Sequence, residues 1–178
     1  MPSDRPPFPR EIEAEARVAE ALRARLAAAE QPLWAGAAIA APRMSMGPAL
    51  ADRLGRAARA DALVLGLEAA AARLDREAHG LAAADARRGE ARGARVSRLL
   101  LVADDGAERF YREVERVARR HGARLLVCRL ALDAAALGAA VTGRGSRVKA
   151  VLVEDKHVVA DLLGALAREA EPAGQGGA

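Results

Sequence analysis

Three continuous apolar segments, each followed by a helical pattern, constrain the fold of this chain more than any other feature. The apolar segments span residues 97–103, 124–130 and 148–153, and such runs are typical of strands buried on both faces of a sheet. The helical patterns cover residues 108–121, 133–141 and 155–168. Strands that alternate with helices favour right-handed crossover connections and a sheet covered on both sides. We therefore predict an α/β protein, a three-layer α/β/α sandwich.

A helix–strand–helix pattern precedes these units. Residues 49–59 have a helical pattern, residues 62–65 form a short apolar segment that ends at Gly66, and a long helical stripe runs from residue 67 towards residue 88. The apolar residues of that stripe alternate steps of four and three, as one face of a helix requires. We place these elements in the same domain, which is predicted to span residues 49–168 around a small mixed sheet.

Residues 1–48 are predicted to form a helical extension to this domain. Prolines in the first ten residues indicate a disordered, flexible lead-in. Val18, Leu22 and Leu26 recur at every fourth position of a predicted helix over residues 11–30. Such a stripe would suit a partner helix or a second copy of the chain.

An apolar connection follows that helix. The segment from residue 33 to residue 50 carries Pro42 and Pro48, so we expect an ordered, partly buried connection rather than regular structure. Its Trp34 and Met44 are expected to pack the N-terminal helix onto the body of the protein. At the other end, the glycine-rich residues 169–178 are predicted to be disordered.

Composition excludes several classes of protein. A single cysteine, Cys128, rules out a disulfide framework and multi-cysteine zinc sites, and its mid-strand position predicts a buried, inert thiol. Aromatic residues make up only 2% of the chain, which argues against a surface of stacked rings. No apolar run approaches the ~18 residues of a membrane span, and the amino-terminal residues lack the apolar segment of a secretory signal. We expect a cytoplasmic protein with no membrane partner.

The charge balance permits nucleic acid as a partner without establishing it. Lys and Arg number 28 against 24 Asp and Glu, a formal net charge of +4. Nearly all of the positive charge is arginine, since Lys149 and Lys156 are the only lysines. Arginine's planar guanidinium suits phosphates and base edges. The same excess is also compatible with solvated helix faces.

Carboxylates follow two of the predicted buried strands, as Asp104 and Asp105 and as Glu154 and Asp155. Strand ends can hold metals in open α/β sheets, so a small Rossmann-like, metal-dependent enzyme that uses Asp104, Asp105 and Asp155 is one interpretation. Capping of helix N-termini accounts better for Asp105 and Asp155. The three histidines lie on different predicted helices, so no two-histidine metal face exists. We predict no metal, no cofactor and no catalytic residue.

A basic, glycine-rich loop is the strongest candidate for binding. Thr142-Gly143-Arg144-Gly145-Ser146-Arg147 joins a predicted helix to a predicted strand, with Lys149 just beyond. Glycines let backbone amides approach a phosphate, and the arginines add charge. The Gly-Lys-Ser/Thr ending of a P-loop is absent, and the loop enters a strand instead of a helix. We interpret it as a basic edge for RNA, with a plain flexible turn as the alternative.

Five short motifs occur in the order and at the spacing of a known family. They are Leu54-Gly55-Arg56-Ala57, Gly66-Leu67-Glu68-Ala69, the strand end at residues 101–107, Leu137-Gly138-Ala139-Ala140 and the strand and helix start at residues 148–155. Over about residues 49–167 the chain resembles the small kink-turn RNA-binding ribosomal proteins and their bacterial relatives, which share the L-seven-Ae and L-thirty-e-like fold. This resemblance requires residues 62–65 to join the sheet of residues 97–103.

The resemblance implies a non-catalytic RNA-binding accessory protein, associated with the ribosome, that recognises structured RNA. Its RNA face would join the helix start to the loop, and its residues would be Gly66, Leu67, Glu68, Gly143, Arg144, Gly145, Arg147 and Lys149. RNA-binding members of the family carry polar residues after the glycine, whereas Ala69 offers no polar group to a base. The alternative is a protein-interaction module that has lost RNA binding and uses residues 11–30 for a partner or for self-association.

Overall fold

The computed structural model describes residues 5–90 and 93–169. The helices are α1 (Arg10–Glu13), α2 (Ala16–Ala28), α3 (Pro48–Arg59), α4 (Leu67–Arg88), α5 (Glu108–His121), α6 (Ala134–Thr142) and α7 (Lys156–Arg168). The strands are β1 (Glu30–Pro32), β2 (Ala40–Met44), β3 (Leu63–Leu65), β4 (Arg98–Val102), β5 (Leu125–Leu130) and β6 (Ala150–Val153). From residue 48 onward every predicted element is present, with its ends within about two residues of the prediction.

The strands of the described chain form one mixed sheet in the order β1-β2-β5-β4-β6-β3. Strands β2, β5 and β4 run parallel, whereas β6 is antiparallel to both of its neighbours, β4 and β3. β3 therefore joins the sheet that contains β4, as the family resemblance requires. The predicted α/β/α sandwich with a small mixed sheet is confirmed.

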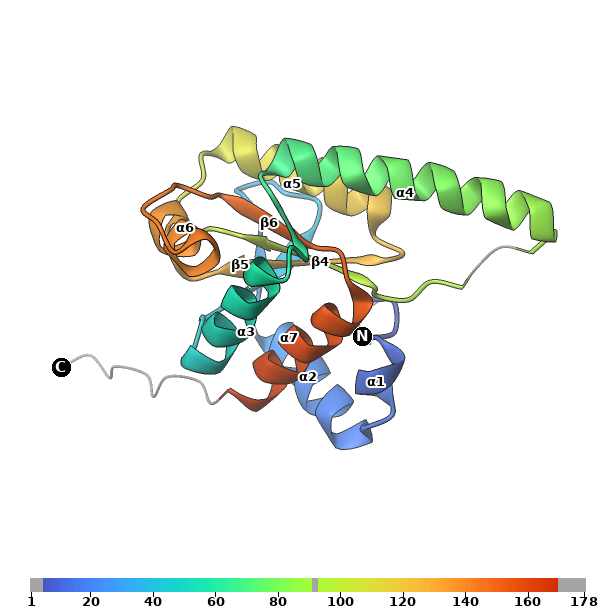
Figure 1. Cartoon of the computed structure of the whole chain (residues 1–178), viewed down its shortest axis with the longest axis horizontal. Coiled ribbons are helices and arrows are strands. Elements are labelled where there is room, and N and C mark those ends of the chain that lie inside the picture. Colours follow the sequence, from blue (N-terminus) through green and yellow to red (C-terminus); the bar gives the residue numbers. More distant parts are fainter. Residues whose placement is uncertain (1–4, 91–92, 170–178) are drawn as a thin grey trace.

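Helices cover both faces of this sheet. α4 and α5 lie on one face, and α1, α2, α3, α6 and α7 pack on the other (Figure 1). Within β4, Leu99 and Leu101 join the core beneath α7, while Leu100 and Val102 join the core beneath α4 and α5. All four side chains are fully buried. In the part of the chain that the structure describes, no helix is both long enough and apolar enough to cross a membrane.

The segment predicted as a connection, residues 33–50, supplies one strand, and β1 lies directly before it. Ala40–Met44 form β2, which pairs in parallel with β5 through Arg43↔Arg129 and Met44↔Leu130. Pro42 has no N–H to donate, but it precedes the two residues that pair with β5, so the ladder to β5 loses no bond. β1 then pairs with the free side of β2. The segment is ordered and partly buried as expected, but the prediction lacked its strand, because Pro42 pairs with Glu30 of β1 and lies outside the positions paired with β5.

The described start of the chain also packs into the core. Phe8 is 3% exposed. The Val96 N–H donates to the Pro7 carbonyl at 2.8 Å, and Arg95 Nη1 donates to the Phe8 carbonyl at 2.6 Å. The prediction of a flexible lead-in is therefore wrong for residues 5–10, because Phe8 has apolar surface to bury. Residues 1–4 lie outside the described residues.

The apolar stripe of the N-terminal helix faces the protein's own core. Leu22 and Leu26 are fully buried, Val18 packs partly buried against the same core, and α2 lies against α7. The predicted helix over residues 11–30 is also interrupted between α1 and α2. Because α7 already covers this stripe, it cannot serve a partner helix or a second copy, and the expectation of docking through residues 11–30 is corrected.

At the other terminus, Glu169 caps a helix. Its carboxylate accepts hydrogen bonds from the Leu50 N–H at 2.7 Å and from the Gly47 N–H at 3.2 Å, at the start of α3. A carboxylate at that end of a helix satisfies N–H groups that lack intrahelical acceptors. The rest of the predicted disordered tail, residues 170–178, lies outside the described residues.

Trp34 lies on the α4–α5 side of the sheet and not against the N-terminal helix. Its Nε1 donates to the Glu115 carboxylate of α5 at 2.7 Å, and the Ala38 N–H donates to the other carboxylate oxygen at 2.7 Å. Glu115 is only 8% exposed. The hydrogen bond from Trp34 lowers the pKa of this carboxyl below its ordinary value. Met44, in contrast, packs with α2 in the core as expected.

The last strand runs opposite to the direction that a right-handed crossover would give. β6 is antiparallel to β4, with Val102 opposite Ala150. The chain leaves β5, forms α6 and folds back along that helix, where the Val148 N–H donates to the Ala134 carbonyl at 2.8 Å. Because the chain returns to the edge that it left, β6 begins where β4 ends. This reversal decides which predicted site residues meet.

Candidate nucleic-acid interface

One edge of the sheet gathers the predicted binding residues. We call it the carboxyl edge, where β2, β5 and β4 end and β6 begins. Arg43, Arg129, Val102 and Ala150 are successive partners across these four strands. The Gly66 N–H donates to the Ala150 carbonyl at 2.8 Å. The start of α4 therefore lies beside the loop that leads into β6, as the fold was expected to place it.

Gly66 makes the turn from β3 into α4. Its φ of +91° lies in the left-handed region, which glycine adopts without steric cost. Among the described residues no side chain caps α4, so its first-turn N–H groups have no side-chain acceptor there. Glu68 is exposed, whereas Leu67 packs against the α4–α5 core. Leu67, which was predicted as an RNA contact, therefore packs against the protein's own core.

A close backbone approach holds the loop of residues 142–149 against α6. A Cβ atom at Gly138 would lie 1.5 Å from the Ser146 carbonyl oxygen, so only glycine fits. Thr142 Oγ1 donates to the Gly138 carbonyl at 2.8 Å and accepts from the Arg144 N–H at 3.1 Å. Gly143, with φ +63°, ends α6 in the left-handed conformation. The loop is packed in place and is not a free turn.

The polar surface of this loop faces solvent. Its exposed residues include Gly143, Arg144, Gly145, Arg147 and Lys149. Arg147 pairs with Asp105 at 2.8 Å, yet its side chain stays 65% exposed. Lys149 Nζ lies 6.0 Å from the centre of the Phe110 ring, at the limit of a cation–π contact. Arg144 forms no ion pair with the described residues. The loop therefore offers three cationic groups to an anionic ligand.

Two further arginines at this edge were not indicated by the sequence. Arg43 of β2 donates from Nε and Nη2 to Asp104 Oδ2, at 3.0 and 2.6 Å. Arg129 of β5 pairs with the other carboxylate oxygen, and its guanidinium carbon lies 4.6 Å from the centre of the Tyr111 ring. Burial opposes ionisation of Asp104, but the hydrogen bond from Arg43 and the charge of Arg129 lower its pKa below the ordinary value. Arg43 was missed because its strand was not predicted.

The carboxylates considered as metal ligands do not come together. Asp104 is engaged by arginines, and Asp105 accepts a hydrogen bond from the Ala134 N–H at the start of α6, at 2.9 Å. Asp155 caps α7, and its backbone hydrogen bonds from Val158 and His157 lower its pKa. Since β6 runs antiparallel to β4, Asp155 lies at the opposite edge from Asp104. Among the described residues, no group of three side chains could hold a metal ion.

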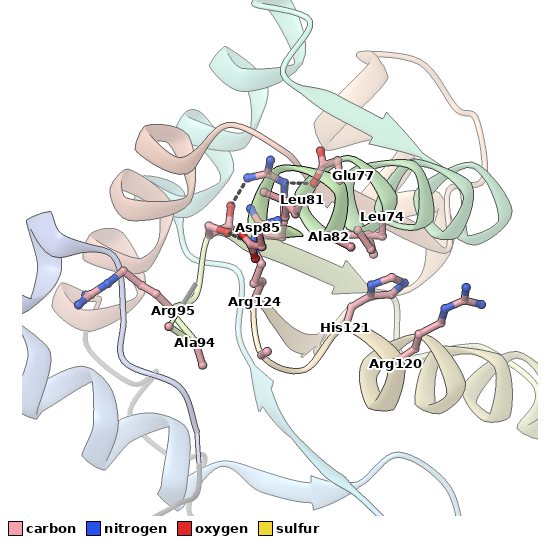
Figure 2. Close-up of a pocket in the computed structure, with 15 residues that line it drawn as sticks. Leu74, Glu77, Leu81, Ala82, Asp85, Ala94, Arg95, Arg120, His121 and Arg124 are labelled. Atoms are coloured by element: carbon pink, nitrogen blue, oxygen red, sulfur yellow. Dashed lines mark hydrogen bonds and ion pairs between the residues drawn. The ribbon is translucent and has the colours of Figure 1, made fainter. Parts of the chain in front are cut away.

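A hollow of about 450 Å³ lies beneath α4 at the opposite edge. Figure 2 shows α4 on one side of it and the end of α5 and the start of β5 on the other, with labelled lining residues that include Leu74, Leu81, Ala82, His121 and Arg124. Basic groups along it are paired within the chain, His121 with Asp75 at 3.0 Å and Arg98 with Glu77 at 2.8 Å. None of the predicted binding residues lines this hollow.

The chain matches no protein-family profile and no curated protein. Among solved structures, a protein of unknown function from Bacillus halodurans has a TM-score of 0.47 and 21% sequence identity, over 67% of this chain and 97% of that chain. The Giardia lamblia 15.5kD RNA binding protein has a TM-score of 0.42 and 15% identity, over 66% of this chain and 83% of that chain.

Proposed function

We propose that this protein binds structured RNA, without catalysing a reaction, through the carboxyl edge of its sheet. The observation that carries the proposal is the hydrogen bond between Gly66 and Ala150, which brings the start of α4 beside the basic loop. Arg144, Arg147 and Lys149 are exposed there. Backbone amides at a helix start and nearby arginines are groups that bind phosphates.

The composition of the edge favours recognition of the RNA backbone and shape. Side-chain stacking on unpaired bases needs exposed aromatic rings, and the chain has only 2% aromatic residues. Ala69 and Leu67 offer no hydrogen bond to a base, and the exposed Glu68 repels phosphate. Affinity should therefore come mostly from phosphate contacts, as in the recognition of folded RNA by shape.

Kink-turn RNA and an association with the ribosome form the finer part of this proposal. They are supported by the sequence resemblance over about residues 49–167 to the kink-turn RNA-binding ribosomal proteins. We therefore propose a folded RNA with a sharply bent backbone as the ligand, since a bend brings phosphates of both strands to one narrow protein edge.

A protein-interaction module is the second candidate, and one observation favours it. Leu65 is 41% exposed directly before the start of α4, where Ala69 is also exposed. Exposed apolar side chains are more typical of a protein interface than of a phosphate-binding surface. A partner bound there would bury Leu65 and would show little dependence on salt.

Titration of a kink-turn RNA at several salt concentrations tests the proposal. With three phosphate contacts, the plot of log affinity against log salt should have a slope of about −2 to −3. The double variant Arg144→Ala with Arg147→Ala should weaken binding and flatten this slope by about two. Arg87→Ala with Arg88→Ala is the matched control, because these exposed arginines lie at the far end of α4.

Three results would overturn the proposal. They are no binding at low salt, an equal loss in both double variants, and a slope near zero. An equal loss would mean that net charge alone drives association. A protein partner whose binding depends little on salt and is lost in Leu65→Asp would instead support the protein-interaction module.

A further inference from the structure

We infer that Arg43 and Arg129 form a second phosphate-binding position of the RNA interface, so that the segment before residue 49 takes part in binding. This inference rests on the proposed function and extends it to a part of the chain that the family resemblance does not cover. Its ligand is the same RNA backbone that the loop of residues 142–149 would contact.

The two positions are connected through adjacent carboxylates. Asp104 and Asp105 follow β4, and together they hold arginines from three different elements. Asp104 pairs with Arg43 of β2 and Arg129 of β5, and Asp105 pairs with Arg147 of the loop. One continuous row of guanidinium groups therefore runs along the carboxyl edge, at the end of the strand that separates β5 from β6.

The cluster of Arg43, Asp104 and Arg129 keeps a net charge of +1. Arg43 uses Nε and Nη2 on Asp104, and its Nη1 makes no hydrogen bond to the described residues. Its side chain is 39% exposed, against 20% for Arg129. The carboxylate thus orients both arginines and leaves a planar donor group directed away from it, which suits a phosphate oxygen. The hydrogen bond to Asp104 raises the pKa of Arg43, which stays charged at every working pH.

A similar cluster at the opposite edge carries no net charge. Arg73 of α4 lies 2.6 Å from Glu154 and 3.5 Å from Glu77, and its side chain is 44% exposed. Glu77 also pairs with Arg98 at 2.8 Å, so this cluster holds two arginines and two carboxylates and its net charge is zero. Arg43 and Arg73 are similar in exposure and ion pairing, but of the two clusters only that of Arg43 carries a net positive charge for a phosphate.

Salt-dependent RNA titration of single variants provides the first test. Arg43→Gln should weaken RNA binding about fivefold at physiological salt and reduce the salt slope by about one, the value of one phosphate contact. Arg73→Gln should leave both unchanged. Arg43→Lys should keep the slope, because a lysine still neutralises one phosphate. Circular dichroism of each variant checks that it folds.

A footprint on the Arg43→Lys variant provides the second test and does not require Arg43→Gln to fold. The natural chain has only Lys149 and Lys156, one in the loop and one at the start of α7 on the opposite edge. Bound RNA should protect Lys149 and the introduced amine from acetylation, while Lys156 should react equally with and without RNA. Mass spectrometry reads each position separately.

The outcomes separate the two proposals. If RNA protects Lys149 but not the introduced amine, or if Arg43→Gln behaves like Arg73→Gln while the loop variant loses affinity, the inference is wrong and the proposed function stands. If the wild-type protein binds no RNA, or Lys149 stays unprotected, both fail.

Discussion

Replacing Gly138 by alanine should displace the basic loop from α6. The Cβ atom would lie 1.5 Å from the Ser146 carbonyl oxygen and 2.6 Å from its carbon. These are backbone atoms, so no side-chain rotation relieves the clash. The loop must move by roughly 2 Å before ordinary contact is restored. That movement would break the hydrogen bond from the Val148 N–H to the Ala134 carbonyl, which is 2.8 Å long.

The expected loss of unfolding free energy follows from the steric clash and from the broken hydrogen bond. Overpacking a well-packed site costs about 1–3 kcal/mol, and one net backbone hydrogen bond contributes about 0.5–1.5 kcal/mol. Gly138→Ala should therefore lower the free energy of unfolding by about 2–4 kcal/mol. For a domain whose total stability is about 5–15 kcal/mol, this loss is large. The displaced loop should also bind RNA more weakly than the wild-type loop.

Urea unfolding followed by circular dichroism measures the loss. Gly80→Ala is the matched control, since Gly80 lies within α4 and, apart from neighbouring backbone of that helix, no atom of the described residues comes within 4 Å of its Cβ position. There the same substitution should raise stability by about 0.5–1 kcal/mol, because alanine is the better helix former. If Gly138→Ala were as stable as the wild type, the close packing of loop and helix described above would be wrong.

Three further predictions concern buried groups. Burial raises the pKa of Cys128 to about 12, so the native thiol should react slowly with thiol reagents at neutral pH, and Cys128→Ala should cost about 1 kcal/mol without changing RNA affinity. Asp104 has a folded-state pKa below its unfolded value, so its contribution is complete at neutral pH and is lost as pH falls through the folded-state pKa. Asp104→Asn should thus be less stable than wild type at pH 7, and denaturant titrations should show the gap closing as the pH falls below the ordinary pKa of an aspartate; a constant gap would contradict this. Glu115→Gln leaves Trp34 Nε1 or the Ala38 N–H without its carboxylate acceptor, so emission from this single tryptophan should shift to longer wavelength and stability should fall, whereas unchanged emission would argue against the contact.

Local signals in the sequence were sufficient for the elements from residue 48 onward. Apolar periodicity located the helices, and continuous apolar runs located β4, β5 and β6. Asp155 was predicted as a helix N-cap, and it accepts backbone hydrogen bonds at the start of α7. Each of these signals acts within a few residues of chain, so it is readable without the fold.

Contacts between segments far apart in the sequence could not be predicted from such local signals. β2 forms because Arg43 and Met44 meet β5, far along the chain, and Pro42 within the strand argued against it in the sequence. Asp105 was expected to cap the helix that follows it, but its carboxylate accepts from Ala134 at the start of α6. Glu115 is buried because Trp34 and Ala38 reach it from a remote segment.

The candidate interface shows the same division. Glycines and arginines at residues 142–149 and the glycine at residue 66 are sequence features, and they suggested phosphate binding through their chemistry. That these segments meet, and that Arg43 and Arg129 lie beside them, depends on the strand order and on the direction of β6. The direction of β6 also separates Asp155 from Asp104.

The sequence thus determined which groups and local elements exist, because propensity and capping are short-range. Only the tertiary structure decided which groups share an edge, because strand pairing joins residues whose separation along the chain leaves no local signal.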